Sequence, residues 1–437
     1  MSHILITFLG RGEKDGELYP TERYHFEGDN TPYYESSFFG LAVLDHLLAK
    51  KENKPDKLVV LGTNGSMWDA FCQLPEHLDS KYEDDYFELA EITENNAQYS
   101  DQQDVKPYLE TAKTVLQEHL NGAVDCELRV IPYGETQDEQ IAILKEMADS
   151  VNDKDKVSLD ITHGLRHLPM LTVLSAMYLE VVKKVTIEGI YYGAHEMTHL
   201  HNDVAPAVNL RGLLQIAKWV GALKSFDKDG DYSVFADVLK DDGFSKADEL
   251  KKAAYFERVI DLKKATTRLG KITNKLQKEG LPGIGGLFSE QLQERISWYQ
   301  GDSSDDDIRK VYAQQCQLAR SYFEKRDYVR AANFALEGMT TRSLNPGDDP
   351  YNYSVRESAK KRVAQSLDRE NKGNYFLLKE IRNQLAHGSY EKKIADDDPF
   401  KEKKRNTLRE AKSLLENEEQ LRSKLEELMK NLLTAWN

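Results

Sequence analysis

The first half of the chain alternates short hydrophobic runs, rich in β-branched residues, with longer segments in which hydrophobic residues recur at helical spacing. This alternation is typical of a parallel sheet covered by helices. Strands are predicted at residues 4–9, 58–61, 126–131, 157–161, 185–192 and 205–210. Helices are predicted at residues 37–48, 136–147 and 169–182. We therefore expect a doubly wound, Rossmann-like domain over about residues 1–208.

The pattern changes after residue 210, where long amphipathic stretches rich in Lys, Glu, Leu and Ala replace the alternating segments. An all-helical domain is predicted over residues 209–437, with an insert at about 226–307 to which the pattern assigns no role. Clusters of Gly, Pro, Asp and Ser predict breaks at 228–231, 280–286, 301–307, 345–350 and 396–399. Residues 408–433 read as one charged helix, either packed on the bundle or exposed as a solvated cap. The predicted fold class is thus α/β plus all-α.

Composition narrows the classes of function. The 437 residues have room for two domains, and 59 Lys and Arg against 74 Asp and Glu give a net charge of −15. A basic coat for nucleic acid is therefore excluded, so any RNA must meet a local basic patch or a small enclosed site. The 3 cysteines are far apart and suggest neither disulfides nor a CxxC metal site, which favours a reducing cytoplasm. No apolar run approaches the roughly 18 residues of a membrane span, and no secretory signal is predicted.

Three loops that follow predicted strands are rich in glycine, hydroxyl and arginine side chains. They are Gly10-Arg11-Gly12, residues 62–66 and residues 162–167. In an open parallel sheet such loops meet at the carboxyl ends of the strands, where ligands bind. Glycines let backbone N–H groups approach an anion, and Arg11 and Arg166 can neutralise its charge. Turn chemistry alone explains any one of these loops, but three at successive strand ends indicate a cradle for an anion or nucleotide.

Asp160-Ile161-Thr162-His163-Gly164 spells a DxTHG motif, and Phe8-Leu9-Gly10 and Tyr191-Tyr192-Gly193 accompany it. In these segments the chain resembles the DxTHG-motif proteins of type III CRISPR systems. The resemblance implies an N-terminal CRISPR-associated Rossmann-fold (CARF) domain that dimerises and binds a cyclic oligoadenylate, with cyclic tetra-adenylate as the first candidate. Asp160 is expected to orient the loop that follows it. The ligand contacts that the resemblance implies are Gly10, Arg11, Thr63, Ser66, Thr162, His163, Gly164 and Arg166.

His163 and His167 were weighed as metal ligands, but no third ligand stands at a suitable spacing, so no metal is predicted. A second cluster lies near the C-terminus, where Arg382, Asn383 and His387 share a helical segment. Asn383 and His387 fall on one face, and Arg382 is about 140° from His387. An imidazole that titrates near neutrality and a permanent positive charge suit RNA cleavage through the substrate's own 2′-OH, which DNA lacks. Taken alone, an arginine and a histidine on one helix are more often structural or solvated.

Arg382-Asn383 followed by His387 also resembles the R-x4-6-H motif of the HEPN ribonucleases (higher eukaryotes and prokaryotes nucleotide-binding). The resemblance implies that these residues from two subunits meet at one composite catalytic site. The predicted protein is a cytoplasmic homodimer, an endoribonuclease of type III CRISPR antiviral defence that cyclic oligoadenylate activates. It would cut single-stranded RNA without a metal or catalytic cofactor, leave a 2′,3′-cyclic phosphate, and use neither DNA nor a membrane. The charged segment 356–372 is either a basic patch for RNA or a solvated helix face.

Two other classes of function were considered. A sensor that only binds, and recruits partners or regulates transcription, would carry a helix-turn-helix or a basic recognition helix, and neither is identified after residue 210. A nicotinamide or flavin enzyme would need GxGxxG, whereas Gly10-Arg11-Gly12 lacks the third glycine. The sequence leaves open the ring size of the activator, the RNA preference, assembly beyond the dimer and whether the sensor degrades its ligand.

Overall fold

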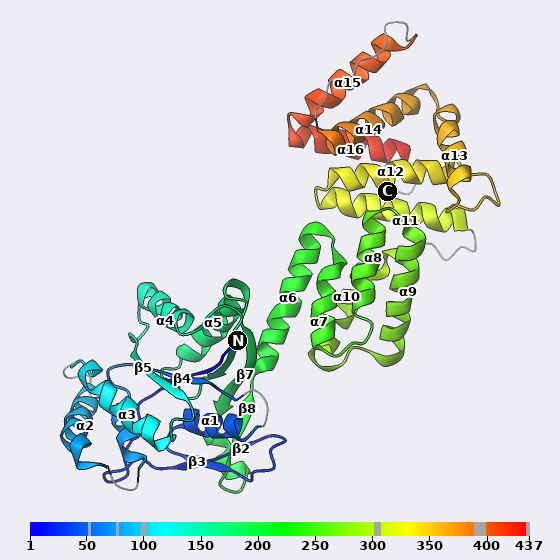
Figure 1. The fold of residues 1–437 in the computed structure, drawn as a ribbon. Helices are drawn as coiled ribbons and strands as arrows, with labels where there is room; N and C mark the ends of the chain where they lie inside the picture. The colour runs from blue at the N-terminus through cyan, green and yellow to red at the C-terminus, as the bar shows by residue number, and fades with distance from the viewer. Residues whose placement is uncertain (51–53, 76–77, 98–102, 301–306, 389–398, 434–437) are drawn as a thin grey trace. The chain divides into compact units, whose positions relative to one another are not determined.

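The computed structural model describes residues 1–50, 54–75, 78–97, 103–300, 307–388 and 399–433. The chain forms two compact units, Met1–Gln215 and Ile216–Asn437, and the boundary falls within helix α6 (Arg211–Asp229) (Figure 1). The roles assigned to the two predicted domains remain predictions. Most residues of the breaks expected at 301–307 and 396–399 lie outside the described residues, which resume at 307 and 399.

The first unit is built on one sheet of eight strands in the order β3-β2-β8-β7-β6-β1-β4-β5. Neighbouring strands are parallel except for the pairs β2/β3 and β7/β8. All six predicted strands are confirmed, and the Rossmann-like fold with them. The strands are β1 (His3–Leu9), β2 (Glu22–Phe26), β3 (Tyr34–Ser36), β4 (Lys57–Gly62), β5 (Asp125–Val130), β6 (Lys156–Asp160), β7 (Thr186–Gly193) and β8 (Ala205–Asn209).

Strands β2 and β3 were not predicted from the pattern. In β2 only Tyr24 and Phe26 are buried, and β3 is three residues long with only Ser36 buried. Two buried positions in a charged segment carry too weak an alternation to distinguish a strand from a loop. Their pairing with β8 and with each other extends the sheet at its edge.

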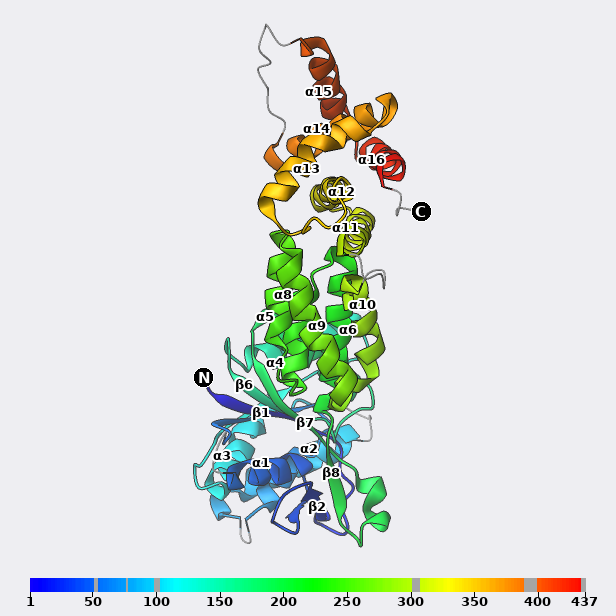
Figure 2. The same cartoon turned by 90° about the vertical axis from the view of Figure 1, so that its right-hand side faces the viewer.

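Helices cover both faces of this sheet (Figures 1 and 2). The side chains of β1 alternate between the two faces, as a strand requires: Leu5 packs in one hydrophobic cluster, and Ile6 and Phe8 pack in the other. Thr136 caps α4, because its side chain accepts a hydrogen bond from the N–H of Glu139 (3.3 Å). The first face carries α1 (Phe39–Ala49), α2 (Glu83–Ala97) and α3 (Leu109–His119), and the second carries α4 (Gln137–Asp149) and α5 (Leu168–Val182).

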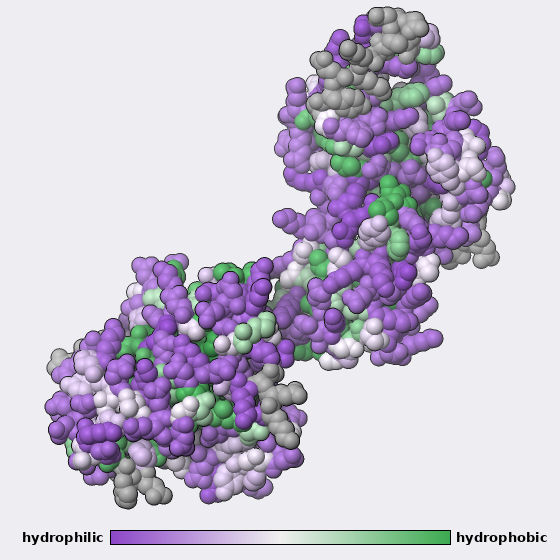
Figure 3. Space-filling model, viewed as in Figure 1, coloured by the Kyte–Doolittle hydropathy of each residue, from purple (hydrophilic) through white to green (hydrophobic). Residues whose placement is uncertain are grey.

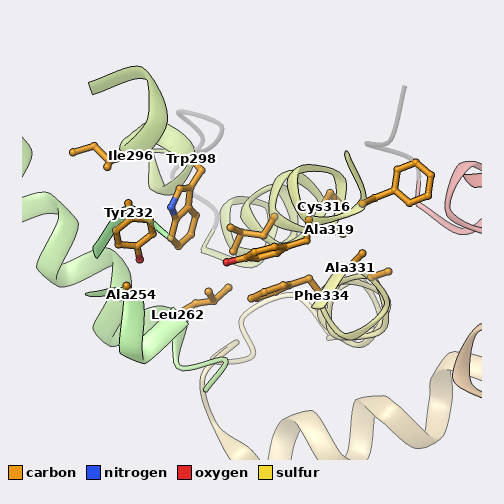
Figure 4. Packing of buried hydrophobic residues seen from close by; sticks show 14 of the residues in the cluster. Tyr232, Ala254, Leu262, Ile296, Trp298, Cys316, Ala319, Ala331 and Phe334 are labelled. Atoms are coloured by element: carbon orange, nitrogen blue, oxygen red, sulfur yellow. The ribbon is translucent and has the colours of Figure 1, made fainter. Parts of the chain in front are cut away.

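The second unit is helical throughout its described residues, as predicted. Its core is dense in aromatic side chains; the rings of Tyr322 and Phe334, for example, stack with their centroids 5.8 Å apart. Figure 4 shows Phe334 and Trp298 among the buried side chains of this core. The breaks predicted at 228–231, 280–286 and 345–350 are confirmed, since helices end at Asp229, Glu279 and Arg342. After α6 the helices are α7 (Phe235–Asp241), α8 (Asp248–Arg258), α9 (Leu262–Glu279), α10 (Ser289–Ile296), α11 (Asp307–Glu324), α12 (Tyr328–Arg342), α13 (Tyr353–Ser366), α14 (Arg369–His387), α15 (Lys401–Leu415) and α16 (Glu418–Leu432).

The single helix predicted over 408–433 is wrong, because two helices, α15 and α16, meet there. The backbone of Asn417 is extended, and its side chain accepts a hydrogen bond from the N–H of Gln420 (3.0 Å), so it caps a new helix. Leu421, Leu425 and Leu428 of α16 are buried in the core. This segment therefore packs on the bundle and is not a solvated cap.

The surface visible in Figure 3 is largely hydrophilic, with smaller hydrophobic areas between the polar side chains. Cys72, Cys126 and Cys316 are buried and form no disulfide. Among the described helices, none is long and apolar enough to cross a bilayer.

Candidate functional site

The three glycine-rich loops meet at one pocket of about 250 Å³, at the carboxyl ends of β1, β4, β5 and β6. Arg166 is the one predicted ligand residue that does not line the pocket; it is exposed in the turn before α5. The predicted residues that line it are Gly10, Arg11, Thr63, Ser66, Thr162, His163 and Gly164.

Close packing and hydrogen bonds join the three loops. A Cβ atom on Gly10 would lie 2.7 Å from the backbone nitrogen of Gly164, so only glycine fits there, and Gly164 itself has a φ of +105°. The hydroxyl of Ser66 donates to the carbonyl of Leu9 (2.7 Å) and accepts from the N–H of Thr63 (2.9 Å). These hydrogen bonds and a third, between the hydroxyls of Ser66 and Thr63 (3.3 Å), are internal, so the main contribution of Ser66 is to hold the first two loops together.

Asp160 lies beneath the third loop and is completely buried. Its carboxylate accepts hydrogen bonds from the hydroxyl of Thr7 (2.5 Å) and the N–H of Thr162 (2.8 Å). Burial raises the pKa of Asp160 to about 6, although both hydrogen bonds act against the shift. The hydroxyl of Thr162 in turn accepts from the N–H of Gly193 (2.8 Å), which ties the DxTHG segment to β7. These contacts agree with the expected role of Asp160 in orienting the loop.

His163 reaches the pocket as a neutral side chain. Its Nε2 accepts a hydrogen bond from the N–H of Phe39 (3.2 Å), which requires that Nε2 carry no proton. Burial lowers the pKa of His163 to about 4, so the ring is uncharged at neutral pH with its proton on Nδ1. The ring therefore offers a ligand an N–H donor, not a positive charge.

The pocket differs in charge from the rest of the molecule. Among the described residues that line it, none is acidic, and Arg11 supplies a positive charge at its edge. In a chain with a net charge of −15 this local absence of carboxylates favours an anionic or nucleotide ligand.

Two polar lining residues, Tyr133 and Asn96, are absent from the site predicted from the sequence. Tyr133 follows β5, so the rule that found the other loops could have found it. Asn96 lies near the end of α2, and its Nδ2 donates to the carbonyls of Asn64 (3.0 Å) and Gln103 (2.8 Å). No local signal links that helix to the pocket.

His167, considered above as a metal ligand, takes part in the framework. Its Nε2 forms a hydrogen bond with the carbonyl of Tyr133 (2.9 Å). A search of the described ranges finds no group of three or more His, Cys, Asp or Glu side chains able to hold a metal ion.

The second predicted cluster lies on α14, the helix that carries Arg382, Asn383 and His387. The Nε of Arg382 is buried and has no hydrogen-bond partner within the described part of the chain. Burial raises the pKa of Tyr375, two turns earlier, and the positive charge of Arg382 acts against that shift. His387 is exposed at the last position of the helix, before Gly388 with a φ of 75°. The helix thus holds a guanidinium and an imidazole within about 7.5 Å of axial rise.

The segment 356–372 spans most of α13 and the start of α14, and its Lys360, Lys361 and Arg369 are exposed, so a role in holding RNA stays a prediction. The segment is interrupted at Asp368, whose side chain accepts from the N–H of Asn371 (2.8 Å) and caps α14. Arg356 donates to the hydroxyl of Thr341 (2.9 Å) and the carbonyl of Pro350 (2.9 Å), so it ties α13 to its neighbours.

A basic helix next to α14 was also missed. The first nine residues of α15, which packs against α14, contain one acidic residue, Glu402. Lys403, Arg405 and Arg409 are exposed there. The run of basic residues from position 401 is visible in the sequence, but the sequence does not show that this helix packs against α14.

Comparison with known proteins gives two matches. Residues 4–196 match the family model described as "CRISPR system endoribonuclease Csx1, CARF domain". The chain is also 24% identical over 444 residues to a CRISPR-associated protein of Methanocaldococcus jannaschii. That alignment covers 95% of this chain and 66% of the relative, so the chain spans slightly less than two thirds of the relative's length.

Proposed function

We propose that the chain, whose residues 4–196 match a CARF-domain family model, is a type III CRISPR endoribonuclease that a cyclic oligoadenylate switches on. Cyclic tetra-adenylate is the first candidate for the activator. The observation that carries the proposal is the acid-free pocket at the strand ends, which gathers seven of the eight residues that the family resemblance implies as ligand contacts.

The chemistry of the pocket supports a cyclic oligonucleotide. Glycines at positions 10 and 164 bring backbone groups close to the cavity, and Arg11 can pair with a phosphate. The neutral ring of His163 can donate from Nδ1 to a phosphate or base acceptor. A cavity of about 250 Å³ is below the range of roughly 300 to 1,000 Å³ for drug-sized ligands, so one subunit would hold only part of such a ring.

A homodimer would supply the rest of the ligand site. Helix α5 begins directly after the third loop and exposes large hydrophobic side chains along one face. A second copy packed on this face would bring its own pocket beside the first. The exposed residues on that face are Met170, Leu174, Met177, Tyr178 and Val181.

The proposed cutting site is on α14. His387 would move protons between the attacking 2′-OH and the leaving oxygen, and Arg382 would stabilise the charge that builds up on the phosphate. Asn383 would position the phosphodiester. The symmetric partner would contribute a second set of the same residues. The basic residues of α15 would hold the RNA backbone beside this helix.

The test is cleavage of a fluorescent single-stranded RNA by the full chain, with cyclic tri-, tetra- or hexa-adenylate and with EDTA present. We expect cleavage with one ring size, 2′,3′-cyclic phosphate ends, and no cleavage of the same sequence as DNA. His387→Ala and Arg382→Ala should abolish cleavage and leave ligand affinity unchanged. His201→Ala, at an exposed position, serves as the matched control. Full cleavage by the His387→Ala protein would refute the catalytic assignment.

A further inference from the structure

A second cavity, of about 270 Å³, lies within the helical unit, between α11 and the insert to which the sequence assigned no role. Aromatic side chains from separate elements form much of its wall: Phe226 of α6, Tyr232, Trp298 and Tyr322 of α11. Glu257 of α8 lies among them. Figure 4 shows Tyr232 and Trp298 near each other in this core.

Three polar atoms in the wall lack hydrogen-bond partners within the described residues: the hydroxyl of Tyr232, one carboxyl oxygen of Glu257 and the indole nitrogen of Trp298. Glu257 is 2% exposed, and one oxygen of its carboxyl accepts from the hydroxyl of Tyr322. Its other oxygen, Oε2, is buried without a partner in the described ranges, and so is Nε1 of Trp298, a residue that is 6% exposed. Buried polar atoms are paired in the great majority of cases. The cavity thus presents one unused carboxyl acceptor, on Glu257, and two unused donors, the hydroxyl of Tyr232 and the indole N–H of Trp298.

The charge of the wall favours a cation. Asp227, Glu257 and Glu294 line the cavity against one basic residue, Arg295. Arg295 already pairs with Asp227 through two hydrogen bonds of 2.9 and 2.8 Å, so these two charges offset each other and Glu257 is the buried carboxyl of the wall that is left for a cation. A carboxylate among aromatic rings is the arrangement that attracts organic ammonium groups.

Basic side chains of the protein already form cation–π contacts with two of the aromatic rings in the wall. Arg330 lies 4.1 Å from the ring centre of Tyr322, and Lys325 lies 5.2 Å from that of Phe226. Within the described residues no such contact is made by Tyr232 or Trp298. The rings of Tyr232 and Trp298 are therefore the ones left for a cationic ligand, and the unpaired indole N–H belongs to the second of them.

We propose that this cavity binds a small organic ammonium compound, distinct from the cyclic nucleotide ligand. The ammonium group donates a hydrogen bond to Oε2 of Glu257, and a second polar group, such as a hydroxyl, accepts from Nε1 of Trp298. The volume is below that of a drug-sized site, which limits the ligand to a short amine. Burial raises the pKa of Glu257 to about 7, and the bound cation favours its ionised form.

The proposal is tested by isothermal titration calorimetry on the full chain with four probes. These are 4-amino-1-butanol, n-butylamine, 1,4-butanediol and inorganic phosphate. We expect the amino alcohol to bind best, the amine to bind more weakly, and the diol and phosphate not to bind. Absence of binding by both amines, or binding of phosphate in preference to them, would overturn the proposal.

Two variants test the contacts. Glu257→Gln should weaken binding of the amino alcohol at least tenfold, whereas Glu290→Gln, at an exposed position on α10, should leave it unchanged. Trp298→Phe removes the N–H and keeps an aromatic ring, so it should abolish the preference for the amino alcohol over n-butylamine. If Glu257→Gln does not fold, as circular dichroism would show, the Trp298→Phe comparison still decides. Unchanged binding in a folded Glu257→Gln protein, or an unchanged preference in Trp298→Phe, contradicts the proposal.

Discussion

At the nucleotide pocket, two buried titratable side chains have opposite pKa shifts for the same physical reason. Burial disfavours the charged form, so it raises the pKa of Asp160 to about 6 and lowers the pKa of His163 to about 4. Asp160 also accepts hydrogen bonds from Thr7 and Thr162, which keep its pKa from rising further. The framework of the third loop therefore contains a carboxyl that titrates just below neutral pH.

This shift predicts how stability depends on pH. Because the folded-state pKa of Asp160 lies above the ordinary value of 3.8, the folded state binds more protons, and its stability falls as pH rises from about 4 to 6. Between pH 5 and pH 7.5 the residue should lower the free energy of unfolding by about 1 kcal/mol. Asp160→Asn should remove this part of the dependence, which urea denaturation at the two pH values would measure. An identical pH dependence in wild type and variant would contradict the shift.

Only some of the side chains that line the nucleotide pocket could be predicted from the sequence. The DxTHG string and the strand-end rule found Gly10, Thr162 and His163, because their positions follow from strands that the local pattern identifies. Asn96 could not be found that way. Its place in the pocket depends on where α2 ends relative to the loop after β4, which no local pattern encodes.

At the scale of elements, α15 carries exposed basic residues, which we propose hold the RNA substrate. Arg356, in the segment first considered for that role, makes internal hydrogen bonds, so replacing it would test stability and not RNA binding. Replacing Lys403, Arg405 and Arg409 together with Ala should weaken RNA binding about tenfold and reduce the slope of log K against log salt by about 2. Fluorescence anisotropy over a salt series would measure both. An unchanged slope would place the RNA elsewhere.

Helix α5 gives the prediction for assembly. Leu174 is 60% exposed on its hydrophobic face, so Leu174→Glu would bury a charge in the proposed dimer contact and should yield a monomer. Phe87→Glu, at a residue 64% exposed on α2, is the matched control and should leave the mass unchanged. Size-exclusion chromatography with light scattering measures the outcome. A dimeric Leu174→Glu protein would exclude this face as the contact.

For the whole molecule, the proposal joins a ligand site in one unit to a cutting site in the other through a shared dimer. Ligand that binds only the dimer stabilises it, by about 2.7 kcal/mol at one hundred times the dissociation constant. Cleavage rate per subunit should therefore fall when the protein is diluted, and saturating cyclic oligoadenylate should shift that fall to lower protein concentration. A rate per subunit that is independent of protein concentration, in a protein that light scattering shows to be monomeric, would contradict this model.

The sequence by itself determined the elements whose signal is local. Six strands, the glycine-rich loops after them and the main breaks between helices follow from periodicity, turn residues and short motifs. Each of these signals lies within a short stretch of consecutive residues. Only the tertiary structure decided the edge strands β2 and β3, the break at Asn417, the place of α15 beside α14 and the cavity around Glu257. These features depend on which faces of segments far apart in the sequence pack against each other. The same packing contacts set the burial, the hydrogen-bond partners and the pKa values of the side chains, and no local sequence pattern encodes them.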